Sequence, residues 1–217
     1  MAKIASMVEL STTNLHVKEY YSILLPIRTY NKSNVNIDWL ILMESVILGG
    51  GCFWCIEAPF SEINGIISIK PGYAGGDKEN PTYREVCTEK TGHAEVVMIE
   101  FDPTIIKLEL ILEIFFTIHD PTQLNQQGND IGTQYRSCIF VTHESHYEII
   151  EEQIKKAEKL WGKKIVTTIE KLNNFWIAEL EHHNYFFNNP NQPYCQAIII
   201  PKIVKAREKY HYLYNNK

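Results

Sequence analysis

The stretch GGGCFWCIE, residues 49–57, places three glycines before two cysteines that are separated by a phenylalanine and a tryptophan. The short apolar run at 45–48 predicts a strand, and the residues after Cys52 predict a helix that Pro59 kinks or shortens. Glycines between the two allow a backbone turn that other residues cannot make cheaply. The stretch therefore predicts a strand, a glycine turn and a helix, with a thiol at the turn.

The position of Cys52 at the start of a helix indicates a reactive thiol. Free amides and the helix dipole favour an anion there, so we expect the pKa of Cys52 to be lowered. A small buried cysteine is the commoner explanation of such a residue. The neighbouring Phe53 and Trp54 favour an apolar pocket, selective for an apolar or sulfur-bearing group, over plain core packing.

In the rest of the chain, stretches with the period of a strand alternate with stretches with the period of a helix, and the sequence has no internal repeat. Ser145 and Glu148 have the spacing of a capping box that opens a helix ending near 160. The patterns predict strands at 66–73, 95–101, 135–141 and 165–170, and further helices at 105–118 and 178–188. We expect one α+β domain.

Residues 1–42 lack the basic start and apolar core of a secretory signal, and the apolar run at 39–43 is too short to span a bilayer. We expect 1–42 to be an extension and 43–217 to form the domain. The alternative is an ordered appendage that packs Trp39 and Leu40 on the domain.

The bulk composition narrows the function classes. A chain of 217 residues with net charge −5 gives no reason to expect nucleic acid or an anionic membrane as a partner. Five cysteines, an odd number, argue against a structural disulfide framework. We expect a cytoplasmic protein with mostly unpaired thiols.

Four more stretches have the composition of sites, although each alone is explained by turns or polar loops. They are GYAGG (72–76) with NPTYREV (80–86), TGHAEVV (91–97), GNDIGTQYRS (128–137) and NPNQPYCQ (189–196). Together with GCFW (51–54), and in this order, they closely resemble the A-type peptide methionine sulfoxide reductases. The resemblance runs from about residue 43 to the C-terminus, and implies a compact two-layer α+β sandwich around a mixed sheet.

The resemblance also implies roles for the matching residues. Cys52 would be the nucleophile that attacks the sulfur of methionine-S-sulfoxide, free or in a protein. Phe53 and Trp54 would hold the methyl group of the substrate. Glu95 would be the acid that binds the sulfoxide oxygen, and a pocket of aromatics would raise its pKa by disfavouring the charge.

Three polar residues would complete the substrate site by the same resemblance. Tyr83 and Tyr135 would share the binding of the oxygen through hydrogen bonds. Asp130 would bind the polar end of the substrate or support the oxygen-binding network. No metal or organic cofactor is implied.

The resemblance implies that a second cysteine condenses with the sulfenic acid on Cys52, and that thioredoxin reduces the disulfide. Many relatives have glycine where this chain has Cys55, and many carry a glycine-rich tail with a further cysteine where this chain has AIIIPK, residues 197–202. Cys195 matches the usual resolving position, so we favour it; Cys55 is the rival resolver or a relay. We expect a monomer that serves protein repair under oxidative stress.

Two other classes compete with this interpretation. A thiol–disulfide oxidoreductase also uses Cys-x-x-Cys, but Phe53 and Trp54 would hinder the docking of a protein disulfide. A zinc-binding module would need a second ligand pair, for which His182 and His183 are the candidates. Adjacent histidines on a helix point in different directions, which argues against zinc.

Overall fold

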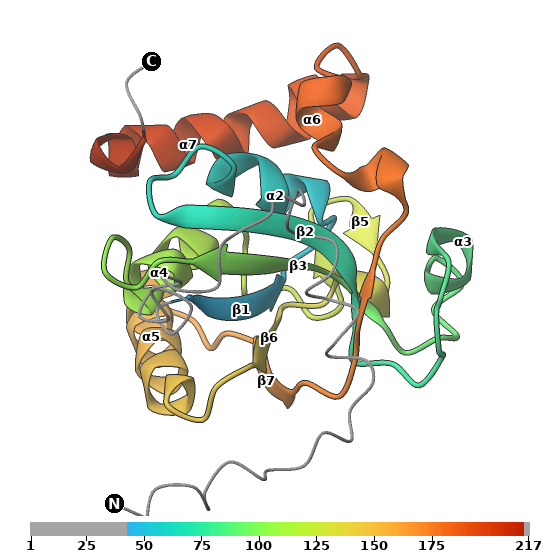
Figure 1. Ribbon diagram of the computed structural model, residues 1–217, viewed down its shortest axis with the longest axis horizontal. Coiled ribbons are helices and arrows are strands. Elements are labelled where there is room, and N and C mark those ends of the chain that lie inside the picture. Colours follow the sequence, from blue (N-terminus) through green and yellow to red (C-terminus); the bar gives the residue numbers. More distant parts are fainter. Residues whose placement is uncertain (1–42, 215–217) are drawn as a thin grey trace, which may run out of the picture. The chain divides into compact units, whose positions relative to one another are not determined.

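The computed structural model describes residues 43–214, so the expectations for 1–42, including Trp39 and Leu40, lie outside the described residues. One six-stranded sheet has the strand order β7-β6-β1-β3-β2-β8 (Figure 1). The pair β6–β7 is parallel and the other pairs are antiparallel, which confirms an α+β fold with a mixed sheet. The strands are β1 Glu44–Gly49, β2 Ile66–Ala74, β3 Ala94–Phe101, β6 Cys138–Val141, β7 Thr168–Lys171 and β8 Phe175–Ile177.

Helices connect and cover these strands. They are α2 Trp54–Phe60, α3 Tyr83–Val86, α4 Leu108–Ile118, α5 His146–Trp161, α6 Tyr185–Asn188 and α7 Ile200–Tyr210. Shorter elements are the hairpin β4 Gln126–Gln127 with β5 Asp130–Ile131, the 3-10 turns η2 Thr133–Tyr135, η3 Leu180–His182 and η5 His211–Leu213, and the π-helical turn η4 Cys195–Ile199. In the part of the chain that the structure describes, no helix is both long enough and apolar enough to cross a bilayer.

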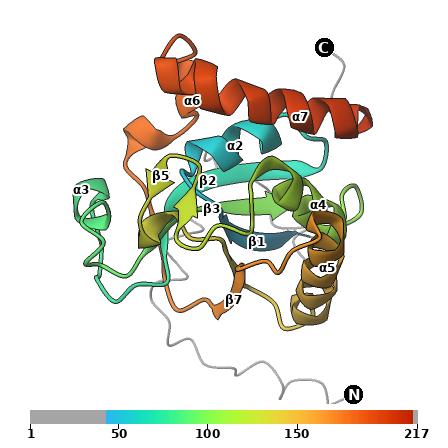
Figure 2. The same ribbon diagram turned by 180° about the vertical axis from the view of Figure 1, so that it is seen from behind.

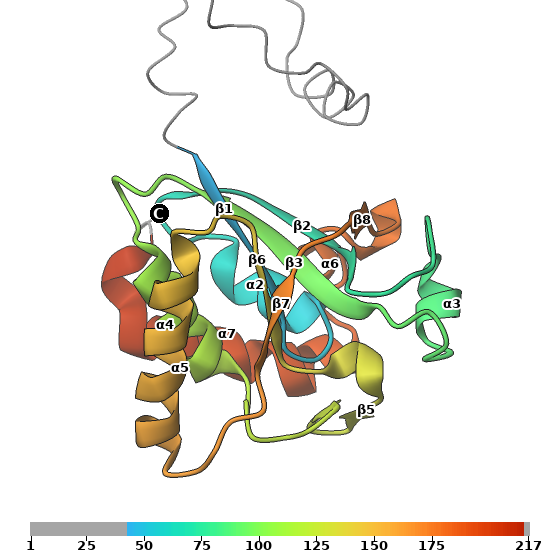
Figure 3. The same cartoon turned by 90° about the horizontal axis from the view of Figure 1, so that it is seen from below.

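Strand alternation divides the interior between the two faces of the sheet. Val46 and Leu48 of β1 belong to the larger core with α2, α4, α5 and α7, whereas Ile47 belongs to a smaller core on the other face. Helix α4 packs against α5 and α7, and α2 packs against α7 (Figures 2 and 3). Because Glu95 is two residues before Val97, the same alternation turns its carboxyl towards the face that carries α2.

Several predicted elements have different bounds. The strand predicted at 135–141 begins only at Cys138, after the η2 turn, and the helix predicted at 105–118 begins at Leu108. The helix predicted at 178–188 is wrong as a single element. It divides into η3 and α6 because Asn184 has a left-handed backbone, φ 51°, which no continuous α-helix contains.

The predicted capping box is also wrong. Ser145 precedes α5 but has helical angles, φ −61° and ψ −19°, and its side chain makes no cap hydrogen bond. A capping side chain reaches the helix amides from an extended residue. Here the first amides donate to carbonyl groups of the preceding turn, His146 N to His143 O and Tyr147 N to Glu144 O.

Candidate active site

The turn between β1 and α2 places Cys52 at the centre of the site. Gly51 has φ 94°, and a Cβ atom there would lie 2.7 Å from the side chain of Gln127. A larger residue would therefore be both strained and blocked. The side chain of Cys52 is buried, and its carbonyl accepts a hydrogen bond from Cys55 N at 3.0 Å.

Glu95 lies against Cys52 from the neighbouring strand β3. Its side chain is fully buried, and its Oε2 accepts a hydrogen bond from Phe53 N at 3.2 Å. Burial raises the pKa of Glu95 to about 8, with Asp130 adding to the rise, whereas hydrogen bonds from Phe53 N–H and the Cys52 thiol oppose it. The expected rise of this pKa is confirmed. Among residues 43–214, no group pairs with Oε1, which leaves this oxygen available to a ligand.

The expectation that Cys52 has a lowered pKa is wrong for this state of the protein. Burial, a hydrogen bond with Cys55 and the charge of Glu95 raise the pKa of Cys52 above its ordinary value. The backbone N–H of Trp54 acts in the opposite direction and is outweighed. The amide of Phe53 that a thiolate could have used is instead bonded to Glu95.

Cys55 lies in a more polar setting than Cys52. Its sulfur is 3.4 Å from Tyr194 Oη, and Tyr194 Oη donates to Asp130 Oδ2 at 2.6 Å. The hydrogen bond with Cys52 lowers the pKa of Cys55 against the effect of burial, and Lys202 and Tyr194 lower it further. A cavity of about 260 Å³ lies beside Cys55; its wall also includes Gln127, Gly128, Asn129, Asp130, Tyr194, Ile198 and Lys202.

Cys195 occupies the η4 turn and is fully buried. Burial raises the pKa of Cys195, and the charge of Cys55 raises it further. Cys55 thus influences the pKa of both Cys52 and Cys195. All five cysteines lie within residues 43–214 and are unpaired in the structure.

Aromatic rings gather around Phe53 and Trp54, the two residues that follow Cys52. The ring centroid of Phe53 lies 6.3 Å from that of Tyr83, and Trp54 stacks on Tyr185 at 3.6 Å and 5°. Burial and then the charge of Glu95 raise the pKa values of Tyr83 and Tyr135, so both hydroxyls stay protonated near the carboxyl. The sequence-predicted residues thus come together, with Asp130 on the Cys55 side.

His182 belongs to this aromatic cluster rather than to a zinc site. Its ring centroid lies 4.5 Å from Tyr83 and 5.2 Å from Phe53, and burial lowers its pKa, which favours a neutral ring. The described part of the chain contains no group of three or more His, Cys, Asp or Glu side chains placed to hold a metal ion.

The sequence interpretation missed residues that support the site. Glu57 is buried on α2, and its Oε1 accepts from Asn184 N at 2.8 Å, which fixes the start of the helix that carries Tyr185. Glu179 accepts from Tyr73 Oη at 2.7 Å and from Tyr83 N at 2.8 Å. Neither glutamate has a sequence signal, because its partner lies at least 96 residues away along the chain.

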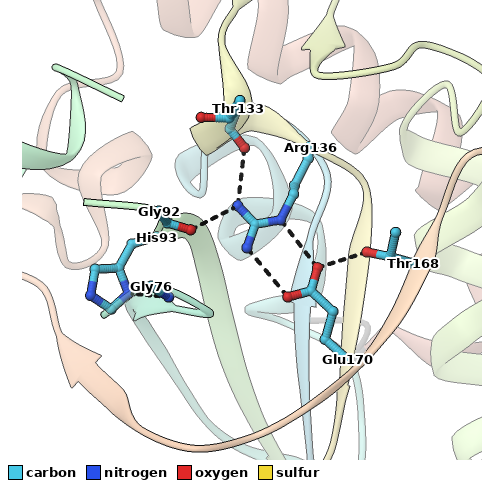
Figure 4. A network of polar contacts seen from close by, with 7 residues as sticks. All are labelled: Gly76, Gly92, His93, Thr133, Arg136, Thr168 and Glu170. Atoms are coloured by element: carbon cyan, nitrogen blue, oxygen red, sulfur yellow. Dashed lines mark hydrogen bonds and ion pairs between the residues drawn. The ribbon is translucent and has the colours of Figure 1, made fainter. Parts of the chain in front are cut away.

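Arg136 links its own motif segment to Gly92 and to Glu170 (Figure 4). Its guanidinium donates to both carboxylate oxygens of Glu170, at 3.1 and 3.3 Å, and to the carbonyls of Gly92 and Thr133, each at 3.2 Å. Gly75 lies against it, and a Cβ there would come within 2.5 Å of the guanidinium. These bonds hold the segment of Tyr135 against the loop that leads to Glu95.

Known proteins match this chain over the described region. The model of the family "Peptide methionine sulfoxide reductase" matches residues 44–214. A peptide methionine sulfoxide reductase MsrA of Saccharolobus solfataricus is 54% identical over 163 residues, 75% of this chain and 92% of the relative. One of Sulfolobus acidocaldarius is 52% identical over 168 residues, covering 77% and 96%.

Solved structures agree with the sequence relatives. Reduced Mxr1 of Saccharomyces cerevisiae matches with a TM-score of 0.68 at 34% identity, covering 71% of this chain and 90% of that one. Methionine sulfoxide reductase A of Corynebacterium diphtheriae matches with a TM-score of 0.63 at 36% identity, covering 70% and 77%. The fold, the assembled thiol–carboxyl site and these relatives agree that the chain belongs to the peptide methionine sulfoxide reductase family of oxidoreductases.

Proposed function

We propose that this enzyme reduces methionine-S-sulfoxide, free or within oxidised proteins, with Cys52 as nucleophile and Glu95 as proton donor. The observation that carries the proposal is a fully buried carboxyl beside Cys52, with a pKa of about 8, whose Oε1 has no partner in residues 43–214. At neutral pH such a group is largely protonated, so it can donate to a sulfoxide oxygen.

The raised pKa of Cys52 requires that its proton leave during the reaction. Protonated Glu95 donates its proton to the sulfoxide oxygen, and the carboxylate then accepts the thiol proton of Cys52 across their hydrogen bond. The Cys52 sulfur bonds to the substrate sulfur. The substrate S–O bond and this transient S–S bond then break as the oxygen moves to the Cys52 sulfur, which leaves a sulfenic acid on Cys52 and free methionine. Glu95 is protonated again at the end of the step, as it was at the start.

The other site residues position the substrate. Phe53 and Trp54 supply apolar faces for the methyl group, and Tyr83 and Tyr135 donate to the oxygen beside Glu95. Asp130 attracts the charged end of the substrate. Fixing the methyl group, the oxygen and the remaining chain of a stereogenic sulfur admits one epimer, and we assign the S epimer.

A second cysteine resolves the sulfenic acid, and thioredoxin reduces the resulting disulfide. The resemblance favours Cys195 as the resolver, whereas the fold favours Cys55, whose amide donates to the Cys52 carbonyl at 3.0 Å and which raises the pKa of the Cys52 thiol. We propose that Cys55 attacks first and that Cys195 can exchange with it afterwards. We place this repair under oxidative stress in the cytoplasm, in a monomer whose domain spans 43–217 with 1–42 as an extension.

The direct test supplies racemic methionine sulfoxide with dithiothreitol and separates the two epimers. We expect consumption of the S epimer alone and none by a folded Cys52→Ser variant. Turnover of that variant above about a hundredth of wild type would overturn the assignment of the nucleophile.

The identity of the resolving cysteine is tested by oxidising the protein with one equivalent of methionine sulfoxide and mapping disulfides by peptide mass spectrometry. We expect a Cys52–Cys55 bond in wild type and thioredoxin-linked turnover in Cys195→Ser. A Cys52–Cys195 bond, with turnover lost in Cys195→Ser and kept in Cys55→Ser, would instead support Cys195.

A further inference from the structure

Lys202 lies at a place where the chain departs from the family pattern. It ends the segment 197–202, which replaces a glycine-rich tail, and it stands in the first turn of α7. Its side chain is partly buried and shares the wall of the 260 Å³ cavity with Cys55 and Tyr194. The chain thus brings a cation to the cavity that Cys55 lines.

The ammonium of Lys202 has no carboxylate partner within residues 43–214. The lysines that form ion pairs in this range are Lys70, Lys78, Lys156 and Lys209. Asp130 lines the same cavity, but its carboxylate accepts the hydroxyl of Tyr194 instead. A partly buried cation without a counter-ion stabilises negative charge that develops nearby.

We propose that Lys202 is the cation that stabilises the thiolate of Cys55 while Cys55 attacks the sulfenic acid on Cys52. This inference rests on the proposed function, and it adds a residue that acts on the resolving step alone. Its charge lowers the pKa of Cys55, in agreement with the shared cavity. The hydroxyl of Tyr194, 3.4 Å from the sulfur, donates its hydrogen bond to Asp130, which leaves Lys202 as the charged group that can stabilise the thiolate.

The step needs no further reactant. The Cys55 thiolate attacks the Cys52 sulfur, the S–S bond forms and the S–O bond breaks. The departing hydroxide combines with the proton that Cys55 released, giving water. Lys202 exchanges no proton in this step, so its role is electrostatic.

Six charged or titratable groups act on Cys55 from the surrounding elements. They are Cys52 before α2, Glu95 on β3, Asp130 on β5, Tyr194 before η4, Cys195 in η4 and Lys202 on α7. Of these, Lys202 is the one that is cationic, so its removal is not compensated by another group in the set. His119, which Lys202 also approaches, is neutral because burial lowers its pKa to about 3.

The test compares Lys202→Met with Lys202→Arg, which keeps the charge, and with Lys205→Met, which removes a cation from the same helix at a position over the Trp161 ring. Reduced proteins are mixed with excess methionine sulfoxide, without reductant, and quenched. Released methionine reports the first step, and the Cys52–Cys55 disulfide, measured by peptide mass spectrometry, reports the second.

We expect Lys202→Met to release methionine as fast as wild type but to form the disulfide about threefold more slowly at pH 7. Losing a nearby cation raises a thiol pKa by about one unit, which cuts the thiolate tenfold. The more basic thiolate is a better nucleophile, with a Brønsted coefficient of about 0.4–0.5, which restores about threefold of the rate. The deficit should vanish near pH 10, and Lys202→Arg and Lys205→Met should match wild type.

Three outcomes overturn the inference. They are disulfide formation in Lys202→Met at the wild-type rate, a deficit that is the same at every pH, and a wild-type disulfide that joins Cys52 to Cys195. In each of these the wild type still releases methionine, so the proposed reduction survives. Absence of methionine release from wild type would instead overturn the proposed function itself.

Discussion

The backbone amide of Phe53 donates to Oε2 of Glu95 at 3.2 Å, across the boundary between α2 and β3. This bond uses the amide that the start of a helix offers, and it turns Glu95 towards Cys52. The two acids then have different roles. Cys52 keeps its proton through burial, and Glu95, with a pKa of about 8, is the group that can pass a proton to a ligand.

The pH dependence of methionine release should report Glu95. The reaction starts from the Cys52 thiol and a protonated Glu95, so kcat/KM should be constant near neutral pH and fall above about pH 8, where Glu95 ionises. Glu95→Gln still donates but cannot accept the thiol proton, so its rate should instead rise with pH as Cys52 ionises. Glu95→Ala should lose more activity than Glu95→Gln. Single-turnover rates at subsaturating substrate measure this, and equal losses in both variants would contradict the donor role.

Glu95 should also lower the stability of the fold near neutral pH. Its folded pKa is raised from 4.5 to about 8, so the folded state keeps a proton that the unfolded chain releases as pH rises through that window. Stability is therefore greatest below about pH 4.5 and falls towards pH 8. At pH 7, Glu95→Gln should be more stable than wild type by about 3 kcal/mol. Thermal unfolding should show a gap of roughly 6–12 °C at pH 7 that shrinks at pH 5; a constant gap would argue against this origin.

The local sequence was sufficient to predict the strand, glycine turn and helix around Cys52 and the strand that carries Glu95. It was insufficient for 178–188, because the left-handed Asn184 is compatible with the helical pattern and is fixed by a bond to Glu57. The contacts of Cys55 could not be predicted from the local sequence either. Tyr194 lies 139 residues away along the chain, so only the folded structure shows that it contacts this thiol.

The extension should be dispensable if the domain begins where the family match does. The described residues start at 43 and the match starts at 44. A chain that starts at Met43 should keep full activity and a similar melting temperature. A fall of more than about 5 °C, which is roughly 1–2 kcal/mol for a domain of this size, would show instead that residues 1–42 stabilise the domain.

Tyr185 should set the affinity for the substrate through Trp54. The two rings stack at 3.6 Å and 5°, and such pairs contribute about 0.5–1.5 kcal/mol. Tyr185→Leu should free the indole and raise KM by about two- to tenfold, with a smaller change in kcat. Phe187→Leu is the matched control, because Phe187 lies on the same helix with an exposed ring. A fall in kcat at unchanged KM would contradict a binding role.

Arg136 should stabilise the fold through its forked guanidinium. Lysine keeps the charge at this position but cannot donate to both oxygens of Glu170 and to the carbonyls of Gly92 and Thr133 together. Arg136→Lys should therefore cost about 1–3 kcal/mol, because the side chain is largely buried and its partners lose bonds. That loss corresponds to a fall in melting temperature of roughly 2–12 °C.

Arg207 provides the control for this change. It pairs with Glu62 in an exposed setting, where ion pairs contribute about 0–1 kcal/mol, so Arg207→Lys should shift the melting temperature little. Because Arg136 holds the segment of Tyr135 against the loop before Glu95, Arg136→Lys should also slow methionine release, whereas Arg207→Lys should not. A stability loss in Arg136→Lys as small as that in Arg207→Lys would mean that charge alone, rather than the geometry of the fork, accounts for the effect of Arg136.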